Sequence, residues 1–535
     1  MSNMASQSTH PPLYADEKAP TTLSSPFSSG LIRTPANDAS DMQRLGKKQE
    51  FKRNFSYLST LGFVSIYMAT WEFVLISLSS GFTNGGFGGL FWVFIGTVVC
   101  YSSIVASLAE MESMAPTAGG QYHWTSEWAP PGAQKWLSYA SGWMSTLGWI
   151  ASVASSVFVI VTLVEVMITV TYPDYAFKNW SYTLIMLAFT VITIFCNTWG
   201  ARILPLLNTI MLYCHFAGFV IVFVTIWVMC PRNQAKQVFL EVVNGGGWEN
   251  VGTACLLSQV TVVYCNLGSD SIVHISEEVE DASLVVPRCM WWSYLINVTL
   301  GILMLIAMLF SIGSLEAVLE SPAPYLSLFM NTGSTAMALF LLIFLLLLIF
   351  CGNITALATC SREMWAFSRD KGLPFSHWIS RMDRKNNVPN NAVYLASVLS
   401  AVLCLINIGS TTAFNIIVSL TLLGLLSTYM LSIGCVLLKR LKGEALPPAR
   451  WSLGRFGLPI NMFAFLYSGF VMIFACFPVE LPVTIETTNW APLVWVGVIL
   501  LAVVVYVLHG KNHYTPPVEF VEGRREAGKG FQSVD

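Results

Sequence analysis

Three small or polar residues interrupt one long apolar run near the middle of the chain. Gly268, Ser269 and Asp270 lie inside the run at residues 250–275, shortly after Tyr264. A glycine and a carboxylate within a membrane-spanning helix break its backbone hydrogen bonding where lipid offers no water, so the freed groups must face protein or a cavity. Interrupted helices of this kind form substrate sites in secondary transporters. The pattern therefore predicts a site for a small solute.

A carboxylate also falls within the first apolar run, at residues 57–82, together with Thr70. Glu72 would cost roughly 2.5 to 3.5 kcal/mol at the centre of the hydrocarbon, and a partner or a wet cavity must offset this. A carboxylate in a substrate site attracts an ammonium, and aromatic faces add about 0.5 to 2 kcal/mol of cation–π attraction. The aromatic candidates are Tyr67, Trp71, Trp143, Tyr264 and Phe414. Alternatively, Glu72 is protonated or paired and only fixes packing, and the aromatics belong to packed helices and interfacial belts.

A histidine in the fifth apolar run, His215, is a candidate carrier of a coupled proton. Imidazole titrates near neutral pH, so it can bind and release a proton as a cavity opens to either side. The alternative is a neutral histidine that donates to a backbone carbonyl across helices. Asp270 is a second candidate for a proton relay, although a carboxylate there can instead cap the second half of the interrupted helix.

Charged residues at the end of the sixth run are candidates for a gate. Glu277 and Glu278 follow that run, and Arg288 and Arg369 lie in segments expected on the same side of the membrane. Partly buried ion pairs between them could close the pathway and break during transport, because such pairs are stable only while their geometry holds. The alternative is a solvated loop whose pairs contribute little.

The composition places the chain in a membrane. Of its 535 residues, 54% are hydrophobic and only 11% are charged, and the mean hydropathy is +0.61, values that a water-soluble domain of this size could not hide. The net charge of -2 and the lack of a clustered basic surface exclude nucleic acid as a partner. The 12 cysteines have no metal-ligand spacing. We expect the lipid bilayer as a partner, and no metal or cofactor.

Apolar runs long enough to cross about 30 Å of hydrocarbon predict twelve transmembrane helices. We expect a disordered cytoplasmic tail at 1–50, a ten-helix core at 51–445, two peripheral helices at 446–510 and a second cytoplasmic tail at 511–535. The spans are predicted at 57–82, 89–110, 136–171, 180–199, 203–229, 250–275, 288–312, 335–362, 391–408, 412–438, 458–477 and 490–509.

Basic residues near the span ends set the orientation, since Lys and Arg are retained on the cytoplasmic side. With both termini inside, the cytoplasmic loops collect two dense basic segments, near 368–385 and 438–455. We expect the plasma membrane as the location, with the vacuolar or another internal membrane as the alternative.

The positions of the two interrupted spans predict an internal repeat. The sixth span comes five spans after the first. An inverted repeat of five spans places its two broken helices at this interval, with the substrate between them. An enzyme would need clustered catalytic groups, and the sequence has none. A channel is disfavoured because there is no repeated pore loop.

Several motifs in order make the chain similar to the amino acid, polyamine and organocation transporters, and within them to the fungal branch of amino acid, choline and GABA permeases. The resemblance covers nearly all of the chain after the tail. It is carried by Thr70-Trp71-Glu72, Asn84-Gly85-Gly86, Pro116 to Trp124, Gly268-Ser269-Asp270 through Glu277-Glu278-Val279 to Pro287, Ser361-Arg362 and Ser368 to Pro374.

The resemblance implies a LeuT-like fold, an all-α polytopic protein of twelve helices with a 5+5 inverted repeat and two peripheral helices. Substrate would lie between spans one and six, walled by three, eight and ten. In many relatives a glycine-containing run in span one holds a substrate carboxylate, but this chain has Thr70-Trp71-Glu72-Phe73 there. In proton-coupled relatives a lysine stands near the position of His215.

The combined expectation is a secondary active permease for a small amino compound, such as choline, GABA or an amino acid, with H+ as the coupling ion. The alternatives are an exporter of a nitrogenous metabolite and a nutrient-sensing receptor that has lost transport. The predicted substrate-binding residues are Tyr67, Thr70, Trp71, Glu72, Tyr264, Gly268, Ser269, Asp270 and Phe414.

Overall fold

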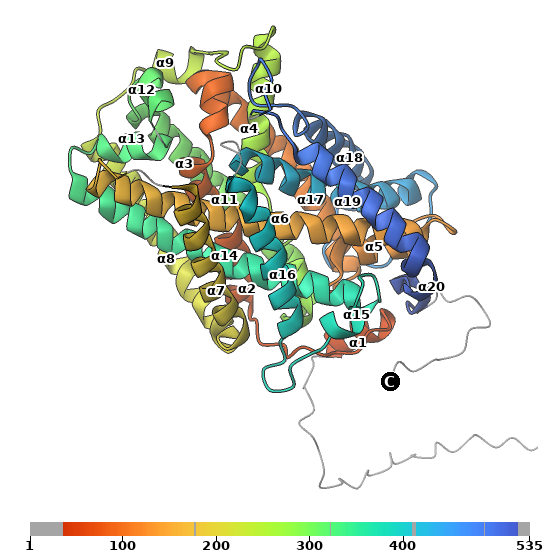
Figure 1. Cartoon of the computed structure of the whole chain (residues 1–535). Helices are drawn as coiled ribbons and strands as arrows, with labels where there is room; N and C mark the ends of the chain where they lie inside the picture. The colour runs from red at the N-terminus through yellow and green to blue at the C-terminus, as the bar shows by residue number, and fades with distance from the viewer. Residues whose placement is uncertain (1–35, 176–177, 322, 409–412, 486, 523–535) are drawn as a thin grey trace, which may run out of the picture. The chain divides into compact units, whose positions relative to one another are not determined.

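The protein folds as a bundle of helices in the computed structural model, which describes residues 36–175, 178–321, 323–408, 413–485 and 487–522 (Figure 1). Ten helical stretches are long and apolar enough to cross a membrane, and α10 and α16 are shorter apolar helices. Within the described ranges, β-structure is limited to two isolated bridges. Helices dominate because each satisfies its own backbone hydrogen bonds in lipid. The predicted all-α multi-pass fold is confirmed.

Twelve segments correspond to the twelve predicted spans. In chain order they are α2 (Tyr57–Met68) with α3 (Thr70–Ile76), α4 (Ser79–Met114), α6 (Gln134–Thr171), α7 (Asn179–Thr198), α8 (Leu204–Met229), α10 (Val251–Asn266), α11 (Ala282–Ser311), α14 (Thr335–Arg369), α16 (Asn390–Cys404), α17 (Ala413–Leu441), α18 (Gly457–Phe474) and α19 (Ala491–Val505).

Short helices connect or follow these spans. The α-helices are α1 (Ala36–Arg44), α5 (Gly120–Trp128), α9 (Ala235–Leu240), α12 (Leu315–Glu320), α13 (Pro324–Met330), α15 (Ser376–Ile379) and α20 (Lys511–His513). The other turns are the 3-10 helices η1 (Ala201–Ile203), η2 (Val273–Glu278), η3 (Leu405–Ile408), η4 (Gly454–Phe456) and η6 (Pro517–Glu519) and the π-helix η5 (Tyr506–Gly510).

The first span is interrupted at Ala69, between α2 and α3. This residue has φ of 42° and ψ of 44°, the left-handed conformation that a non-glycine residue adopts at a cost of about 1 to 2 kcal/mol. The interruption lies one residue before Thr70 to Phe73, the stretch at which the family resemblance predicted it. Because alanine is a good helix former, the residue type gave no signal of this break.

The sixth span is interrupted after Asn266, where α10 ends. Leu267 is extended, Gly268 has φ of +94°, and a turn leads into the 3-10 helix η2. The second half of this span is therefore a short 3-10 segment and not the α-helix that an N-cap at Asp270 would require. Only glycine adopts the conformation of residue 268 without strain, so its presence marked this break correctly.

Two long helices cross closely at the centre of the bundle. A Cβ placed on Gly424 of α17 would lie 2.6 Å from the Cα of Gly148 on α6. Small residues allow membrane helices to approach at backbone distance. The α6 helix also packs on α14, so it forms one side of the space between the two interruptions.

The described residues before the first span and after the last one pack on the bundle, which corrects the predicted disorder of 1–50 from Ala36 onward. Residues 1–35 and 523–535 lie outside the described residues, but α1 is helical and Leu45 and Phe51 are buried. At the other end Tyr514 is buried, and the Glu522 amide donates to the Arg44 carbonyl at 2.8 Å. A few apolar side chains in a polar segment are enough to attach it to a bundle, and average composition conceals them.

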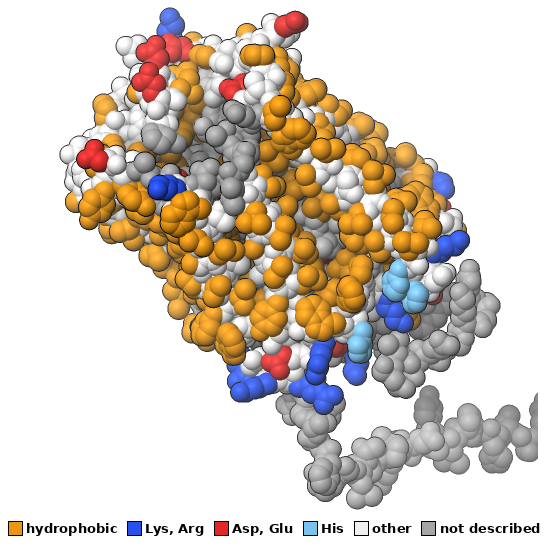
Figure 2. Space-filling view, in the orientation of Figure 1, with side chains coloured by type: hydrophobic (Ala, Val, Ile, Leu, Met, Phe, Trp, Pro, Cys, Tyr) orange, Lys and Arg blue, Asp and Glu red, His pale blue; other side chains and the backbone are white. Residues whose placement is uncertain are grey.

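Basic and acidic side chains gather at opposite ends of the face shown in Figure 2. Lys and Arg cluster at the end that carries α1, α15 and α20 in Figure 1, and Arg381, Arg384 and Lys385 are exposed there. We call this the basic end. Between the ends the surface is largely apolar, as a surface that faces lipid must be.

Candidate functional site

A small cavity lies where the two interruptions meet. Its volume is about 30 Å³, which holds about one water molecule. The lining comes from the first, third, sixth and eighth spans and consists of Tyr67, Met68, Ala69, Phe73, Ser152, Ser156, Tyr264, Leu267, Ile349 and Gly352. The cavity is therefore aromatic with a few hydroxyl groups, and a larger solute would require the surrounding helices to move.

Hydrogen bonds hold the two tyrosines of this cavity. The Tyr67 hydroxyl lies 2.5 Å from the Ser152 hydroxyl, and the Tyr264 hydroxyl donates to Ser155 at 2.9 Å. The ring of Tyr264 meets that of Phe73 edge to face, with centroids 5.4 Å apart. Because α6 supplies both serines, it fixes the orientation of rings from both interrupted spans.

The tenth span contributes at the edge of the cavity. Phe414 does not line it, but its ring centroid lies 6.0 Å from that of Tyr264 and 5.5 Å from that of Phe158. Trp143 stands elsewhere, near Tyr139 on the first turns of α6. Of the five aromatic candidates, Tyr67 and Tyr264 thus line the cavity and Phe414 adjoins it.

Gly268 of the sixth span does not line the cavity but contacts Tyr67, which does. A Cβ at this position would lie 1.8 Å from Cε1 of Tyr67, so any side chain would displace that ring. The neighbouring Ser269 is buried, and its hydroxyl has no hydrogen-bond partner among the described residues. The two breaks are therefore in direct contact through a glycine and a tyrosine.

Glu72 faces away from the cavity and contacts the predicted proton carrier. Its Oε1 lies 2.7 Å from Nδ1 of His215 on α8, and both side chains are fully buried. The indole N–H of Trp71 donates to the same Nδ1 at 3.1 Å. Because Nδ1 either holds a proton and donates, or has a lone pair and accepts, it cannot satisfy both neighbours at once. The location of one proton thus decides which contact is made.

Thr70 is also turned toward the rest of the bundle. Its backbone N–H, the first of α3, donates to Oδ1 of Asn297 on α11 at 3.2 Å. An amide at a helix N-terminus is a natural ligand for a carboxylate, but here a side chain already occupies it. This arrangement removes one of the amides that would hold a substrate carboxylate.

Asp270 ties the second interruption to two other elements. Its carboxylate accepts hydrogen bonds from Nε2 of Gln121 on α5 and from the hydroxyl of Tyr429 on α17, each at 2.6 Å. Hydrogen bonds to both oxygens compensate for burial of the acid. The residue therefore joins the sixth span to the tenth and to the segment between spans two and three.

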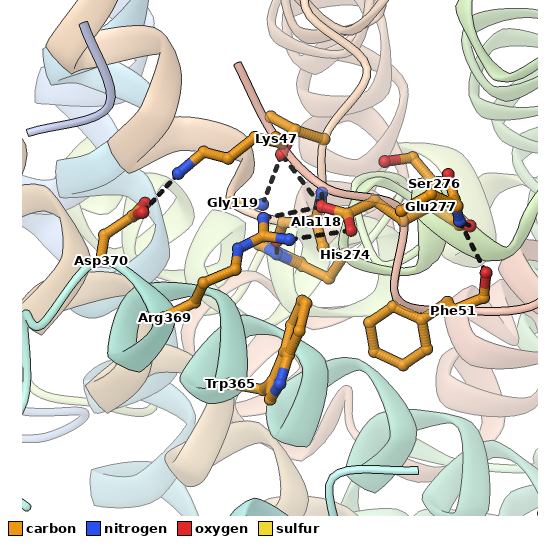
Figure 3. A network of polar contacts seen from close by, with 12 residues as sticks. Lys47, Phe51, Ala118, Gly119, His274, Ser276, Glu277, Trp365, Arg369 and Asp370 are labelled. Atoms are coloured by element: carbon orange, nitrogen blue, oxygen red, sulfur yellow. Dashed lines mark hydrogen bonds and ion pairs between the residues drawn. The ribbon is translucent and has the colours of Figure 1, made fainter. Parts of the chain in front are cut away.

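Two of the predicted gate residues, Glu277 and Arg369, meet at the basic end of the sixth span (Figure 3). The guanidinium of Arg369 donates to both oxygens of Glu277, at 3.0 and 2.8 Å, and Nε of Arg362 donates to Glu278 at 2.9 Å. Bidentate pairs of this kind are strong and directional. Arg288 is exposed and forms no ion pair among the described residues.

The amino-terminal segment adds a second buried ion pair beside the first. Lys47 pairs with Asp370, and the two side chains expose only 5% and 4% of their surfaces. Burial lowers the pKa of Lys47, and the neighbouring carboxylate of Asp370 acts in the opposite direction. The Tyr122 hydroxyl also donates to Asp370, at 3.0 Å, and Figure 3 shows the two pairs side by side. We call the four residues of the two ion pairs, Lys47, Asp370, Glu277 and Arg369, the basic-end latch.

Sequence reasoning missed two members of this latch. Lys47 falls within the predicted tail at 1–50, and Asp370 lies within the motif Ser368 to Pro374 without being a gate candidate. The one usable signal was that Asp370 directly follows Arg369.

In the described part of the chain, no group of three or more His, Cys, Asp or Glu side chains is placed to hold a metal ion. The buried acids of the site instead contact histidine, amide, hydroxyl or guanidinium groups.

Comparison with known proteins gives a consistent result along most of the chain. The sequence pattern of the amino acid permease family matches residues 55–501. The choline transporter of Saccharomyces cerevisiae is 27% identical over 490 residues, covering 90% of this chain and 86% of the relative. The GABA-specific permease of the same yeast is 28% identical over 496 residues, with 90% and 86% covered. Amino-acid permease 2 of Neurospora crassa is 26% identical over 495 residues, with 89% and 88% covered.

Among solved structures, a variant of the manganese transporter of Eremococcus coleocola has a similar fold. The TM-score is 0.52 at 13% sequence identity, and the match covers 89% of this chain and 96% of the other. At this identity the likeness concerns the fold alone.

We expect Gly268→Ala to lower the midpoint of thermal unfolding of the detergent-solubilised protein. The added methyl group would overlap Tyr67 and would occupy a conformation unfavourable for alanine, and overpacking alone typically costs about 1 to 3 kcal/mol. Gly443→Ala is the matched control, since Gly443 also has positive φ but has no atom within 4 Å of the place that an added methyl group would take. Equal midpoints for the two variants would contradict the close contact of the two breaks.

We expect Lys47→Met to open the basic-end latch. Removing one partner of a buried ion pair leaves the other charge uncompensated, which typically costs about 3 to 5 kcal/mol. Hydrogen exchange followed by mass spectrometry should show faster exchange at residues 115–122. The exposed neighbour Lys48 supplies the control Lys48→Met, and exchange that is equally slow in both variants would exclude a role for Lys47 in closure.

Proposed function

The chain belongs to the amino acid permease family, and we propose that it carries a small amine or quaternary ammonium compound across the membrane by alternating access, in symport with a proton. Its relatives include a choline transporter, a GABA-specific permease and an amino-acid permease. The chain is therefore a multi-pass transporter of amino compounds and not an enzyme.

The observation that carries the choice of substrate is the aromatic cavity at the meeting point of the two interruptions. Tyr67, Phe73 and Tyr264 supply ring faces, and Ser152 and Ser156 supply hydroxyl groups. Among the described residues that line it, none is charged. Aromatic faces favour an ammonium by about 0.5 to 2 kcal/mol, and the carboxyl end of α10 adds the negative end of a helix dipole.

The occupied amide of Thr70 supports the same choice. Since Asn297 already accepts from this N–H, a substrate carboxylate cannot rely on it. A compound that is recognised through its nitrogen, such as choline or GABA, fits the site better than one that requires capture of an α-carboxylate. Tyr67, Tyr264, Gly268 and Ser269 are the proposed contacts.

Two features support alternating access: the small size of the central cavity and the ion pairs at the basic end. The cavity of about 30 Å³ has no room for choline or GABA, so binding requires α3 and α10 to move apart. The basic-end latch closes the pathway toward one side of the membrane. We propose that the latch breaks when the carrier opens to that side, as Glu277, Glu278 and Arg369 were predicted to do.

The buried contact between Glu72 and His215 supports proton coupling. If His215 is neutral and donates to an ionised Glu72, the pair carries one negative charge in a low-dielectric setting, which is costly. A proton from outside would make the pair neutral, and release of that proton inside would restore the charge. The proton would alter the contact between Glu72 of α3 and His215 of α8. Because α3 also carries Phe73, which lines the cavity, this change would reach the substrate site.

The proposed setting is the plasma membrane, with both termini and the basic end in the cytoplasm. The exposed cations near Arg381, Arg384 and Lys385 support this orientation through the positive-inside rule. Asp270 is proposed chiefly as a structural link, since Gln121 and Tyr429 already bind both of its oxygens.

A competition panel in transport-deficient cells tests the substrate. We expect choline, GABA or a polyamine to inhibit labelled uptake, and uptake to be faster at the lower of two external pH values. Competition only by carboxylates that lack an amine would contradict the proposal. Absence of both uptake and exchange would instead favour a sensor, and efflux without uptake would favour an exporter.

A variant without the imidazole tests the coupling. We expect His215→Gln to retain substrate exchange in proteoliposomes but to lose accumulation driven by a pH gradient. With one proton per substrate, a gradient of one pH unit supports about tenfold accumulation, so the ratio should fall from about ten toward one. The exposed His377 supplies the control His377→Gln, and normal accumulation by the His215 variant would exclude it as the carrier.

A further inference from the structure

A large apolar groove lies away from the substrate cavity, between α6, α17, α18 and α19. Its volume is about 860 Å³, far larger than the central cavity. The α18 helix packs on α17 and α4, whereas α19 packs on α17 and α6, so both peripheral helices use α17 and the groove runs between them. None of the described residues that line it is charged.

The length of the groove corresponds to one half of a bilayer. Along α19 and the first residue of η5, the lining residues run from Trp495 to Tyr506, which at 1.5 Å per residue is roughly 16 Å. The hydrocarbon core is about 30 Å thick. An apolar space at this depth offers water no hydrogen-bond partners, and a void of this size would forfeit packing energy. A hydrocarbon chain from one leaflet is the occupant that matches both its length and its chemistry.

Unpaired cations border the groove where it reaches the basic end. Lys442 directly follows Leu441, and Lys135 directly precedes Trp136, and both of these neighbours line the groove. The Nζ of Lys135 donates to the backbone carbonyl of Lys511 at 2.9 Å, which places the start of α20 beside the start of α6. Among the described residues, none of the three lysines has a carboxylate partner.

Neighbouring basic residues are different because carboxylates already neutralise them. Lys439 pairs with Glu444 at 2.8 Å, and Arg440 pairs with Glu110 at 2.5 Å. The charge left over at the mouth is therefore positive and belongs to Lys135, Lys442 and Lys511. Basic residues beside an apolar groove at the membrane surface attract anionic lipid headgroups, at about 1 kcal/mol per cation.

We propose that the groove binds an anionic phospholipid of the leaflet at the basic end. One acyl chain lies between α18 and α19 against α17, and the phosphate faces the three lysines. Trp136, which exposes 52% of its surface, stands at the headgroup level, where membrane proteins concentrate tryptophan. The lipid attaches both peripheral helices to α17, the helix that also supplies Tyr429 to Asp270.

Native mass spectrometry of the full chain tests this site. The purified protein is delipidated and incubated with equal amounts of phosphatidylserine and phosphatidylcholine that carry the same acyl chains. We expect one phosphatidylserine molecule to be retained, and retention to fall about tenfold when Lys135, Lys442 and Lys511 are all changed to Glu. The matched control changes Arg381, Arg384 and Lys385 to Glu, which alters the charge of the same end equally but away from the groove.

A second variant fills the groove without changing charge. Ala502 is 5% exposed and lines the groove, so Ala502→Phe should exclude the chain and reduce retention. Val504→Phe is its control, because Val504 is 52% exposed on the same helix and does not line the groove. If Ala502→Phe does not fold, the lysine variants alone decide the outcome.

Three results would overturn the proposal: equal retention of the two phospholipids, retention unchanged by the triple lysine change, or retention unchanged in a folded Ala502→Phe variant. The readout is bound lipid and not uptake. A failure of the proposed transport function would therefore leave this test unaffected, and the reverse also holds.

Discussion

The structure depends on one constraint, which is that a backbone amide or carbonyl in lipid must find a partner within the protein. Two spans stop being continuous helices, at Ala69 and at Gly268, and their released groups are met by named neighbours. Asn297 accepts from the first amide of α3, and the turn after α10 closes a hydrogen bond from Ser271 to Gly268 at 3.0 Å. The first interruption therefore depends on a partner from another helix, whereas the turn itself satisfies the released group of the second.

The half-helix α3 links two kinds of chemistry because its faces meet different surroundings. One face places Phe73 beside the aromatic cavity, and the other presents Trp71 and Glu72 to His215 on α8. In the proposed mechanism, a change in proton occupancy on the second face would alter how α3 is held, and α3 also bounds the cavity. Ion and solute would then be coupled through this short helix without direct contact between them.

The charged residues at the basic end fall into two groups, buried ion pairs and exposed lysines. Inside the bundle, Arg369 with Glu277 and Lys47 with Asp370 form pairs whose desolvation is offset only while each partner is in place, so the latch is either made or broken. On the surface, three lysines without a carboxylate partner lie beside the apolar groove that we propose as a lipid site. In these proposals the buried pairs would close the pathway and the exposed lysines would attract an anionic headgroup.

The sequence alone indicated the twelve apolar spans, the interruption at Gly268 and a group of charged residues at the end of the sixth span, because length, glycine and charge are local properties. Which of these charged residues pair, Glu277 with Arg369 and not with Arg288, only the structure decided. The sequence did not determine that Glu72 faces His215 instead of the cavity, since a helix that is apolar or buried all round gives no periodicity from which to deduce its rotation. It also placed Lys47 in a disordered tail, although the segment is held by contacts with residues more than three hundred positions away. Tertiary packing alone decided these features, because rotation and docking depend on the shapes of neighbouring helices.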